Sequence, residues 1–241
     1  MTFPGTPKMR RFIPIWLCVA VLAFGAAPAL AAPLLLSPSD YDPKALLPAP
    51  PPEGSEAAKA ELAELDRIQS QRTPEDFARA DHDFHARDAS LFAAVIGPAF
   101  DLAKLPVTAR LLESVQSEEN TAATVAKDYF RRTRPWIVDP ALKSCSKADA
   151  PQSSYPSGHS AMGYSLGVVL AALIPQKAPA IMARAADFAE NRLVCGMHRR
   201  RDIQSGQVLG TVVAELLLRN PRFAKDFEAA RSELRAAAII P

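Results

Sequence analysis

The chain has 241 residues, of which 49% are hydrophobic and 22% charged, so it has enough apolar side chains for a folded core and is not disordered along its whole length. Its 28 lysines and arginines nearly balance 26 aspartates and glutamates, which excludes the global basic field typical of nucleic-acid binders. With 22 prolines, 10 glycines and no evenly spaced β-branched runs, the composition disfavours a sandwich or barrel and predicts an all-α protein.

Residues 1–31 have the order of a secretory signal peptide. Three basic residues between positions 8 and 11 precede an apolar run at 12–24, and the small-residue pattern Ala29-Leu30-Ala31 follows. A membrane anchor is the alternative, but the run is short for a bilayer span. We therefore expect cleavage, a mature chain that begins near Ala32, and a periplasmic or secreted protein without stable membrane insertion.

Removal of that segment leaves two cysteines, Cys145 and Cys195. An even pair in an oxidising compartment is more often bonded than free, so we expect a disulfide between them. Two cysteines alone cannot form a zinc site.

Residues 32–54 are rich in proline and lack helical periodicity, so we expect an extended arm ahead of a helical domain at 55–241. Thr73-Pro74-Glu75-Asp76 has the cap, first-turn proline and early acids of a helix start, and this helix should run to Ile96 before Gly97-Pro98. Other helices are expected at 107–134, with a break near 117–121, and at 158–174, 178–194, 203–218 and 222–238.

The first cluster of functional candidates contains Lys127 and Arg134, seven residues apart. At about 100° per residue, seven residues return to almost the same helix face, so both cations can point at one object. Pro135 then stops the helix and leaves Arg134 near a loop. A basic helix end is also typical of a solvated face that complements the helix dipole.

The second cluster is Ser157-Gly158-His159, directly before an apolar helical run. A serine and a glycine at a helix start expose backbone N–H groups to an anion, although a simple helix cap and a surface histidine are the alternatives. The third cluster places His198 and Asp202 at i and i+4. This spacing lets the carboxylate accept the Nδ1 proton and leaves Nε2 as a nucleophile or base; a simple helical ion pair is the alternative.

Taken in order, Lys127-x6-Arg134-Pro135, Pro156-Ser157-Gly158-His159 and Arg192-x5-His198-x3-Asp202 resemble the signature of the type 2 phosphatidic acid phosphatase and vanadium haloperoxidase superfamily. The sequence around the second and third motifs is similar to the class A bacterial non-specific acid phosphatases. The resemblance covers about 107–210 and implies a compact single-domain helical bundle.

For binding, the resemblance implies that Lys127, Arg134 and Arg192 hold the phosphoryl oxygens, together with Ser157 and the backbone N–H groups around Gly158. Three fixed cations could supply the charge stabilisation that a metal ion supplies elsewhere, so no metal and no cofactor are expected.

For chemistry, the resemblance implies that His198 attacks phosphorus to give a phosphohistidine, Asp202 orients His198, and His159 protonates the leaving alkoxide. The expected function is an acid phosphatase for small-molecule phosphate monoesters, inhibited by vanadate, with its best pH on the acid side of neutrality. The alternatives are a lipid phosphate phosphatase, a vanadate-dependent haloperoxidase and a phosphate-binding protein without turnover. Homo-oligomer formation is left open.

Some residues fall outside this pattern. Asn191 stands where the family usually has serine before the arginine of the third motif. His82 and His85, at i and i+3, would suit a metal ion, but a solvated helix face explains them as well. The run of Arg199, Arg200 and Arg201 is typical of surface charge, with contact between one of the three and the substrate as the alternative.

Overall fold

The computed structural model describes residues 1–2 and 34–241 of the chain, so the predicted signal peptide lies outside the described residues apart from its first two. The all-α prediction is confirmed: within the described residues the regular elements are α-helices and short 3-10 helices. The longer helices are α2 (Glu56–Gln71), α3 (Pro74–His85), α5 (Pro106–Phe130), α7 (Gly158–Leu173), α8 (Ala178–Val194), α9 (Arg200–Leu218) and α10 (Pro221–Ala236). Single-turn helices are α1 (Pro43–Leu46), α4 (Ala93–Ile96) and α6 (Pro135–Val138).

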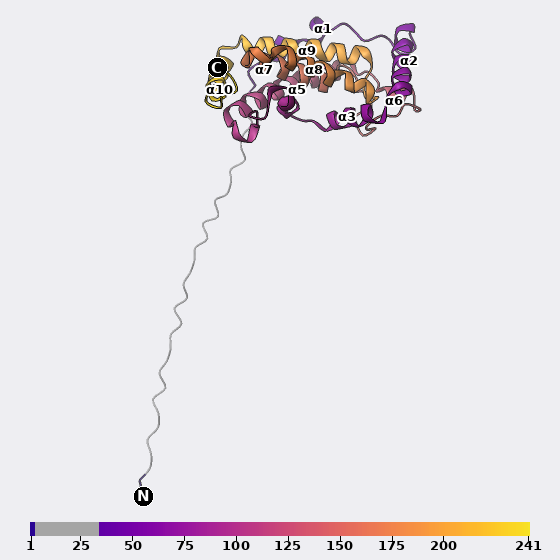
Figure 1. Ribbon diagram of the computed structural model, residues 1–241. Coiled ribbons are helices and arrows are strands. Elements are labelled where there is room, and N and C mark those ends of the chain that lie inside the picture. The colour runs from indigo at the N-terminus through magenta and orange to yellow at the C-terminus, as the bar shows by residue number, and fades with distance from the viewer. Residues whose placement is uncertain (3–33) are drawn as a thin grey trace. The chain divides into compact units, whose positions relative to one another are not determined.

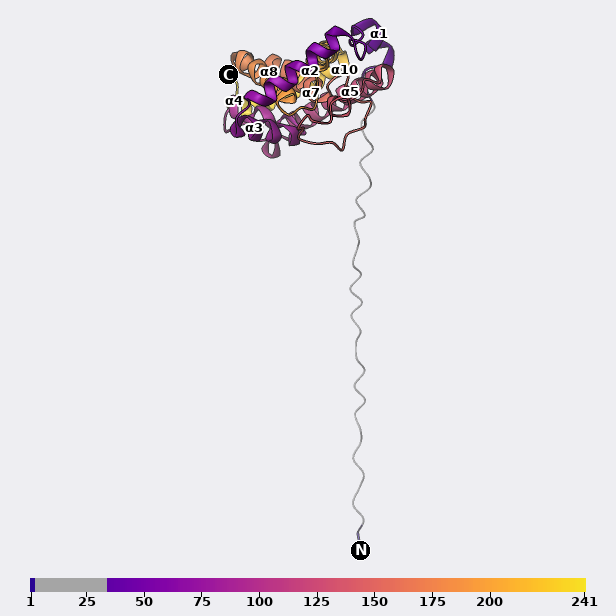
Figure 2. The ribbon, with the colours of Figure 1, turned by 90° about the vertical axis from the view of Figure 1, so that its right-hand side faces the viewer.

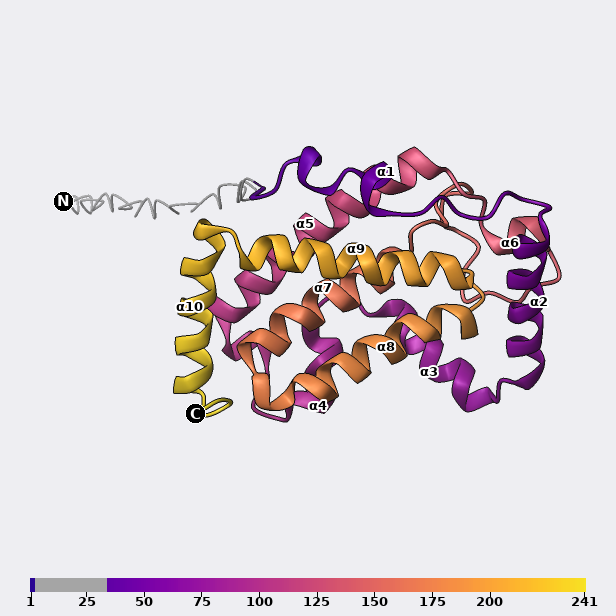
Figure 3. The ribbon, with the colours of Figure 1, turned by 90° about the horizontal axis from the view of Figure 1, so that it is seen from above.

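Helix α7 forms the centre of the bundle. Its sequence is apolar on nearly every side, which is typical of a helix surrounded by others, and most of its residues are buried. It packs against α9, α8 and α5, and Figure 3 shows α8 and α9 running alongside it. Helices α10 and α2 lie at opposite ends of the bundle (Figure 1). Figure 2 shows α2 running diagonally across the end of the bundle that it covers.

Two glycines of α9 bring its backbone against that of α7. A Cβ atom on Gly206 would lie 2.4 Å from the carbonyl oxygen of Ser157, and one on Gly210 would lie 2.2 Å from that of Ala161. Both distances are far below van der Waals contact, so no larger residue fits without moving a helix. The close crossing lets the Ser157 N–H donate to the Asp202 carbonyl at 2.9 Å, which joins the second and third motifs.

The proline-rich segment differs from the predicted extended arm. It forms a 3-10 turn, η1 (Pro38–Tyr41), followed by α1, and Leu36, Tyr41 and Leu47 are buried in the main core. The carboxylate of Glu118 in α5 accepts hydrogen bonds from the backbone of Leu35 and Leu36. Residues 34–54 therefore belong to the same compact unit as the helices that follow.

Several of the predicted helix limits are wrong. The helix expected to reach Ile96 ends at His85, and a new 3-10 turn, η2 (Ala89–Phe92), starts where the Asp88 carboxylate accepts from the Ser90 N–H at 2.8 Å. The break expected near 117–121 is absent from α5. There the Thr121 hydroxyl donates to the Ser117 carbonyl of its own helix at 2.9 Å, so the polar side chain does not compete with the helix backbone.

Helix α9 begins at Arg200 rather than at residue 203, which places Asp202 in its first turn. Among the described residues, the structure holds no helix with both the length and the apolar character that a bilayer span requires.

Candidate active site

The three motifs meet at the N-terminal end of α7. Lys127 stands in the last turn of α5, which ends at Phe130 and not at the predicted residue 134, because Arg131 has a φ of 49° and turns the chain away. The prediction that Lys127 and Arg134 share one helix face is therefore wrong: Arg134 lies beyond α5, directly before α6. The Lys127 ammonium donates to the carbonyl oxygens of Ser153 and Pro156, at 2.6 and 2.8 Å. These contacts fix the first motif against the loop that leads into the second.

His198 is buried and held by both ring nitrogens. Nδ1 lies 2.8 Å from the Ser154 carbonyl oxygen, which only accepts, so Nδ1 carries the proton. Nε2 is then unprotonated, and its lone pair accepts a hydrogen bond from the Arg134 guanidinium at 3.0 Å. Burial, followed by the charge of Arg134, lowers the pKa of His198 to about 3. The ring is therefore neutral across the ordinary pH range and presents an unprotonated Nε2.

Asp202 has a different position from the one that the i, i+4 spacing predicts. Its carboxylate lies 3.6 Å from Nδ1 of His198, farther than the Ser154 carbonyl. Its close partners are the Arg132 guanidinium at 2.6 Å, the Ser154 hydroxyl at 2.6 Å and the Arg199 N–H at 2.9 Å. Asp202 thus holds the loop whose carbonyl orients the imidazole, as well as facing the imidazole itself.

Burial alone would raise the pKa of Asp202, but its interaction with His198 and the charge of Arg132 outweigh burial and hold this pKa below its ordinary value. Arg132 also bonds to Glu61 of α2 at 2.5 Å. Nothing in the sequence indicates this pairing, because Glu61 and Arg132 are 71 positions apart.

All three guanidinium nitrogens of Arg134 donate hydrogen bonds. Its guanidinium donates to the Asp149 carboxylate at 2.8 Å, to the Ser153 hydroxyl at 3.0 and 3.2 Å, and to the Met197 carbonyl at 3.0 Å. These bonds hold it beside Nε2 of His198.

Arg192 is equally buried, with 1% of its surface exposed, but its Nε and Nη1 have no hydrogen-bond partner among the described residues. Its guanidinium lies 5.3 Å from the centre of the Phe84 ring. Burial, followed by the charge of Arg134, lowers its pKa to about 9. A buried cation with unpartnered donors has the complementary chemistry for an anion.

The second motif forms the start of α7. The Ser157 hydroxyl caps the helix by accepting from the Ser160 N–H at 3.3 Å. A Cβ on Gly158 would meet only the Lys127 side chain, at 3.8 Å, so the protein itself does not fill the space above this glycine. The expected anion cradle is thus open at the positive end of the helix dipole.

His159 is half-buried and stacked on Phe84 at 6.0 Å. Its Nε2 lies 3.1 Å from the Phe84 carbonyl oxygen and 2.8 Å from the Arg87 guanidinium. When Nε2 is protonated it can donate to the Phe84 carbonyl, and when it is unprotonated it can accept from Arg87, so both protonation states have a hydrogen-bond partner. Burial, followed by the charge of Arg192, lowers the pKa of His159 well below 6.5.

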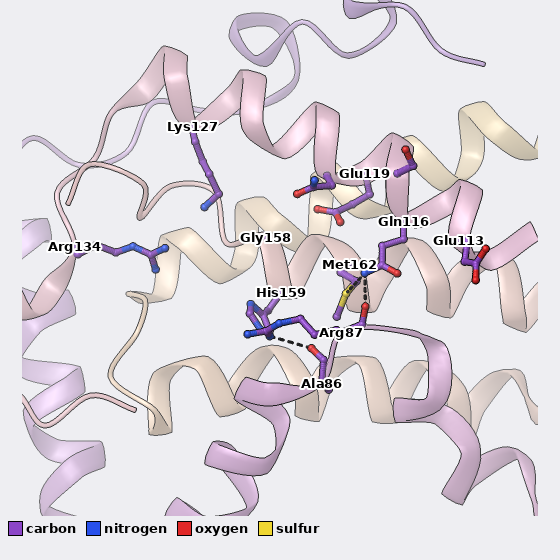
Figure 4. A pocket seen from close by; sticks show the side chains of 12 residues that line it. Ala86, Arg87, Glu113, Gln116, Glu119, Lys127, Arg134, Gly158, His159 and Met162 are labelled. Carbon is purple, nitrogen blue, oxygen red and sulfur yellow. Dashed lines mark hydrogen bonds between the residues drawn. The ribbon is translucent and has the colours of Figure 1, made fainter. Parts of the chain in front are cut away.

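A cavity of about 530 Å³ opens in front of these groups. Figure 4 shows Lys127, Arg134 and His159 directed toward the same space beside Gly158. The cavity continues along α5, where Glu119 and its neighbours line it. The predicted site residues at 127, 134, 158 and 159 therefore share one cavity. Those at 157, 192, 198 and 202 do not line it, although the His198 ring lies 3.0 Å from Arg134, which does.

The remaining histidines lie elsewhere. The side chains of His82 and His85 are 85% and 67% exposed on α3, and neither lines the cavity. Over 1–2 and 34–241, no group of three or more His, Cys, Asp or Glu side chains is placed to hold a metal ion. The exposure of both side chains therefore supports the interpretation that these histidines belong to a solvated helix face.

Asn191 and the arginine run have structural partners. The Asn191 amide donates to Asp83 at 2.7 Å, and Asp83 also accepts two bonds from Arg184, so this position ties α8 to α3. The expectation of surface charge is wrong for Arg199, which is buried and bonded to Glu53 at 2.7 Å. Its neighbour at position 200 pairs with glutamates of α2 and α8.

The predicted disulfide between Cys145 and Cys195 is confirmed, with 5.2 Å between the two Cα atoms. The Cys145 N–H also donates to the Cys195 carbonyl at 2.9 Å. The bridge fixes the loop after α6 to the turn that carries His198.

Comparison with known proteins places this geometry in a family. The model of the PAP2 superfamily matches residues 110–225. An acid phosphatase from Zymomonas mobilis is 32% identical over 95% of this chain and 92% of its own length. Non-specific acid phosphatases from Providencia stuartii (28% identical, 80% of each chain) and Salmonella typhimurium (32% identical, 61% of this chain and 60% of the relative) are also similar.

The crystal structure of Aquifex aeolicus LpxE has the same fold, with a TM-score of 0.53 at 19% identity over 65% of this chain and 93% of that one. The motifs, the helical bundle and the similarity over nearly the whole length agree: the chain belongs to the PAP2 superfamily, among relatives that are acid phosphatases.

Proposed function

We propose that this protein is a phosphatase that hydrolyses phosphate monoesters through a phosphohistidine on His198, without a metal ion. Its acid phosphatase relatives support the phosphatase activity. The observation that carries the mechanism is a pair of buried groups: Arg192, whose Nε and Nη1 have no partner among the described residues, and the neutral His198, whose unprotonated Nε2 faces the Arg134 guanidinium. The first suits a phosphoryl oxygen and the second a phosphorus atom.

Binding needs donors for the non-bridging oxygens of the phosphate. Lys127, Arg134 and Arg192 supply three positive charges, and the N–H groups at the start of α7 add neutral donors. Burial, followed by the charge of Arg134, lowers the pKa of Lys127 to about 7. Lys127 is therefore charged on the acid side of neutrality, where the ester also binds as an anion.

In the first chemical step, the Nε2 lone pair of His198 forms a bond to phosphorus while the P–O bond to the leaving alcohol breaks. The proton on Nδ1 stays directed at the Ser154 carbonyl, which stabilises the positive ring of the phosphohistidine. His159 in its protonated form gives its proton to the leaving oxygen, so the alcohol departs neutral.

In the second step, water attacks the phosphohistidine. His159, now neutral, accepts a proton from the water, the N–P bond breaks, and its electron pair returns to Nε2 of His198. Phosphate leaves and both rings are restored for the next cycle.

The proposal is tested with a chromogenic aryl phosphate, assayed with and without a chelator and with vanadate. Turnover that resists the chelator and is inhibited by vanadate is expected, because vanadate adopts the trigonal-bipyramidal geometry of the transferring phosphoryl group. The wild type should yield an acid-labile phosphoenzyme on quenching, and His198→Ala should yield none and turn over no ester. The mechanism is contradicted if the chelator abolishes turnover and a divalent ion restores it, or if His198→Ala turns over the ester at the normal rate.

We also propose that the protein acts in the periplasm or outside the cell. The disulfide and the signal-like order of residues 1–31 support this location. Cell fractionation should recover the protein outside the cytoplasm, with a new N-terminus near Ala32; an intact N-terminus in the cytoplasm contradicts it.

A further inference from the structure

The cavity has a second end, away from Lys127 and Arg134. Along α5 it is lined by polar side chains spaced one turn apart, at positions 113, 116, 117 and 120. Arg87 and Ala86 from the segment after α3 form the facing wall, and Met162 of α7 forms the floor (Figure 4). The space beyond the proposed phosphate-binding groups therefore has hydrogen-bonding side chains along α5 and at Arg87.

Glu119 is the buried member of this wall. It lines the cavity, only 3% of its surface is exposed, and its Oε1 has no hydrogen-bond partner among the described residues. The neighbouring Glu118 is also buried but has backbone N–H partners. A buried carboxyl group without a partner is unfavourable unless something else satisfies it.

The protonation state of Glu119 fits a neutral partner. Burial raises the pKa of Glu119 to about 8, although the charge of Lys127 opposes the rise. On the acid side of neutrality this group is a carboxylic acid, which both donates and accepts a hydrogen bond. A hydroxyl group has the same pair of properties.

We propose that this end of the cavity is a leaving-group subsite that selects polyhydroxylated alcohols, with Glu119 as its specificity-determining residue. The inference rests on the proposed phosphatase function, since the phosphate of the same ester occupies the cationic end. An apolar alkyl group would leave Glu119 without a partner in the complex. A cationic amino alcohol would meet the field of Lys127 and Arg87, so neutral hydroxyls are the best match.

The test compares two esters with the same carbon number, sorbitol 6-phosphate and n-hexyl phosphate. Both are phosphates of primary alcohols and differ in the hydroxyls that Glu119 would recognise. The measured quantity is the ratio of their kcat/KM values in the wild type, Glu119→Leu and Glu119→Gln. Leucine removes the hydrogen-bonding group, whereas glutamine keeps a neutral donor and acceptor of nearly the same shape.

We expect the wild type to favour the sorbitol ester and Glu119→Leu to reduce the ratio about tenfold, as the loss of one buried hydrogen bond would. Glu119→Gln should stay within about threefold of the wild type. Because leucine replaces an unpartnered polar group, its melting temperature should not fall. An unchanged ratio in Glu119→Leu, or an equal loss on both esters, overturns the subsite. A wild-type protein that hydrolyses neither ester overturns the proposed function as well.

Discussion

Arg192 should make the protein less stable and more active at the same time. Burial lowers its pKa from 12.5 to about 9, and one pKa unit corresponds to about 1.4 kcal/mol, so the charged form is disfavoured in the folded protein by on the order of 5 kcal/mol. Below pH 9 the group is charged in both the folded and the unfolded chain, so this cost is fully present at neutral pH. It declines only as the pH rises above 9.

Arg192→Met removes the charge and keeps a long apolar side chain in the same space. Part of the gain is lost with the contact to Phe84, so we expect the free energy of unfolding to rise by about 1–3 kcal/mol, or the melting temperature by roughly 3–10 °C. The kcat/KM for an aryl phosphate should fall by about 10² to 10³. Thermal unfolding and steady-state kinetics on the same preparation measure both effects.

Arg134 is the matched control, because it is as deeply buried but has hydrogen-bond partners for its guanidinium. Arg134→Met leaves Asp149 and the Met197 carbonyl without their donor, so it should lower both activity and stability, the latter by about 2–4 kcal/mol. Inorganic phosphate should raise the melting temperature of the wild type but much less that of Arg192→Met. A destabilised Arg192→Met, or one that keeps wild-type turnover, refutes the assignment of Arg192 as the open anion ligand.

Four further predictions concern the proton donor, the network, the disulfide and pH. His159→Ala should reduce turnover of an alkyl phosphate far more than that of an activated aryl phosphate, because only the alkoxide needs a proton to leave; equal losses would make His159 a phosphate ligand. Asp202→Asn should reduce kcat less than His198→Ala does, because it leaves the attacking nitrogen in place, and a larger loss would exchange the two roles. Replacing Cys145 and Cys195 together by serine should lower the free energy of unfolding by about 4 kcal/mol in a denaturant titration, given the 50-residue separation; an unchanged midpoint would show that the bond adds no stability. For the alkyl ester, kcat/KM should fall with rising pH already below pH 6.5, because His159 loses its proton there. For the aryl ester, which does not need that proton, the fall should occur at higher pH, near the pKa of Lys127 at about 7. Two profiles that coincide from pH 4 to 9 would contradict this.

Features that depend only on residues adjacent in the sequence could be predicted. The cap at Ser157, the start of α7 at Gly158 and the end of α8 at Val194 follow from local helix chemistry and match the expected boundaries. The pairing of Cys145 with Cys195 could be predicted because they are the two cysteines that remain after the expected removal of the signal peptide, in an oxidising compartment. By contrast, the burial of the proline-rich segment depends on Leu36, which lies in a bend, and on Tyr41, which ends a four-residue 3-10 turn, so neither belongs to a helical period that could be detected.

The orientation of His198, the proposed nucleophile, could not be predicted in this way. The sequence pairs His198 with Asp202 by spacing, but the shorter contact of the ring is with the backbone of Ser154. Backbone acceptors carry no sequence signal, because every residue has the same carbonyl group. The ion pairs of Arg132 join residues about 70 positions apart, which only the packing of α2 and α9 brings together.

The charge balance of the site links binding of the ester to the proton needed for its cleavage. Burial, followed by the charge of a neighbouring arginine, lowers the pKa of both His159 and His198, so in the proposed mechanism the acid is poorly protonated before the ester binds. A phosphate dianion beside Arg192 offsets those charges and raises the pKa of His159. His198 gains less from this change, because its Nδ1 is already a donor to Ser154 and its Nε2 faces phosphorus. In the proposed mechanism, the arginine whose burial lowers the stability of the protein is therefore also the one through which binding of the ester raises the pKa of the acid.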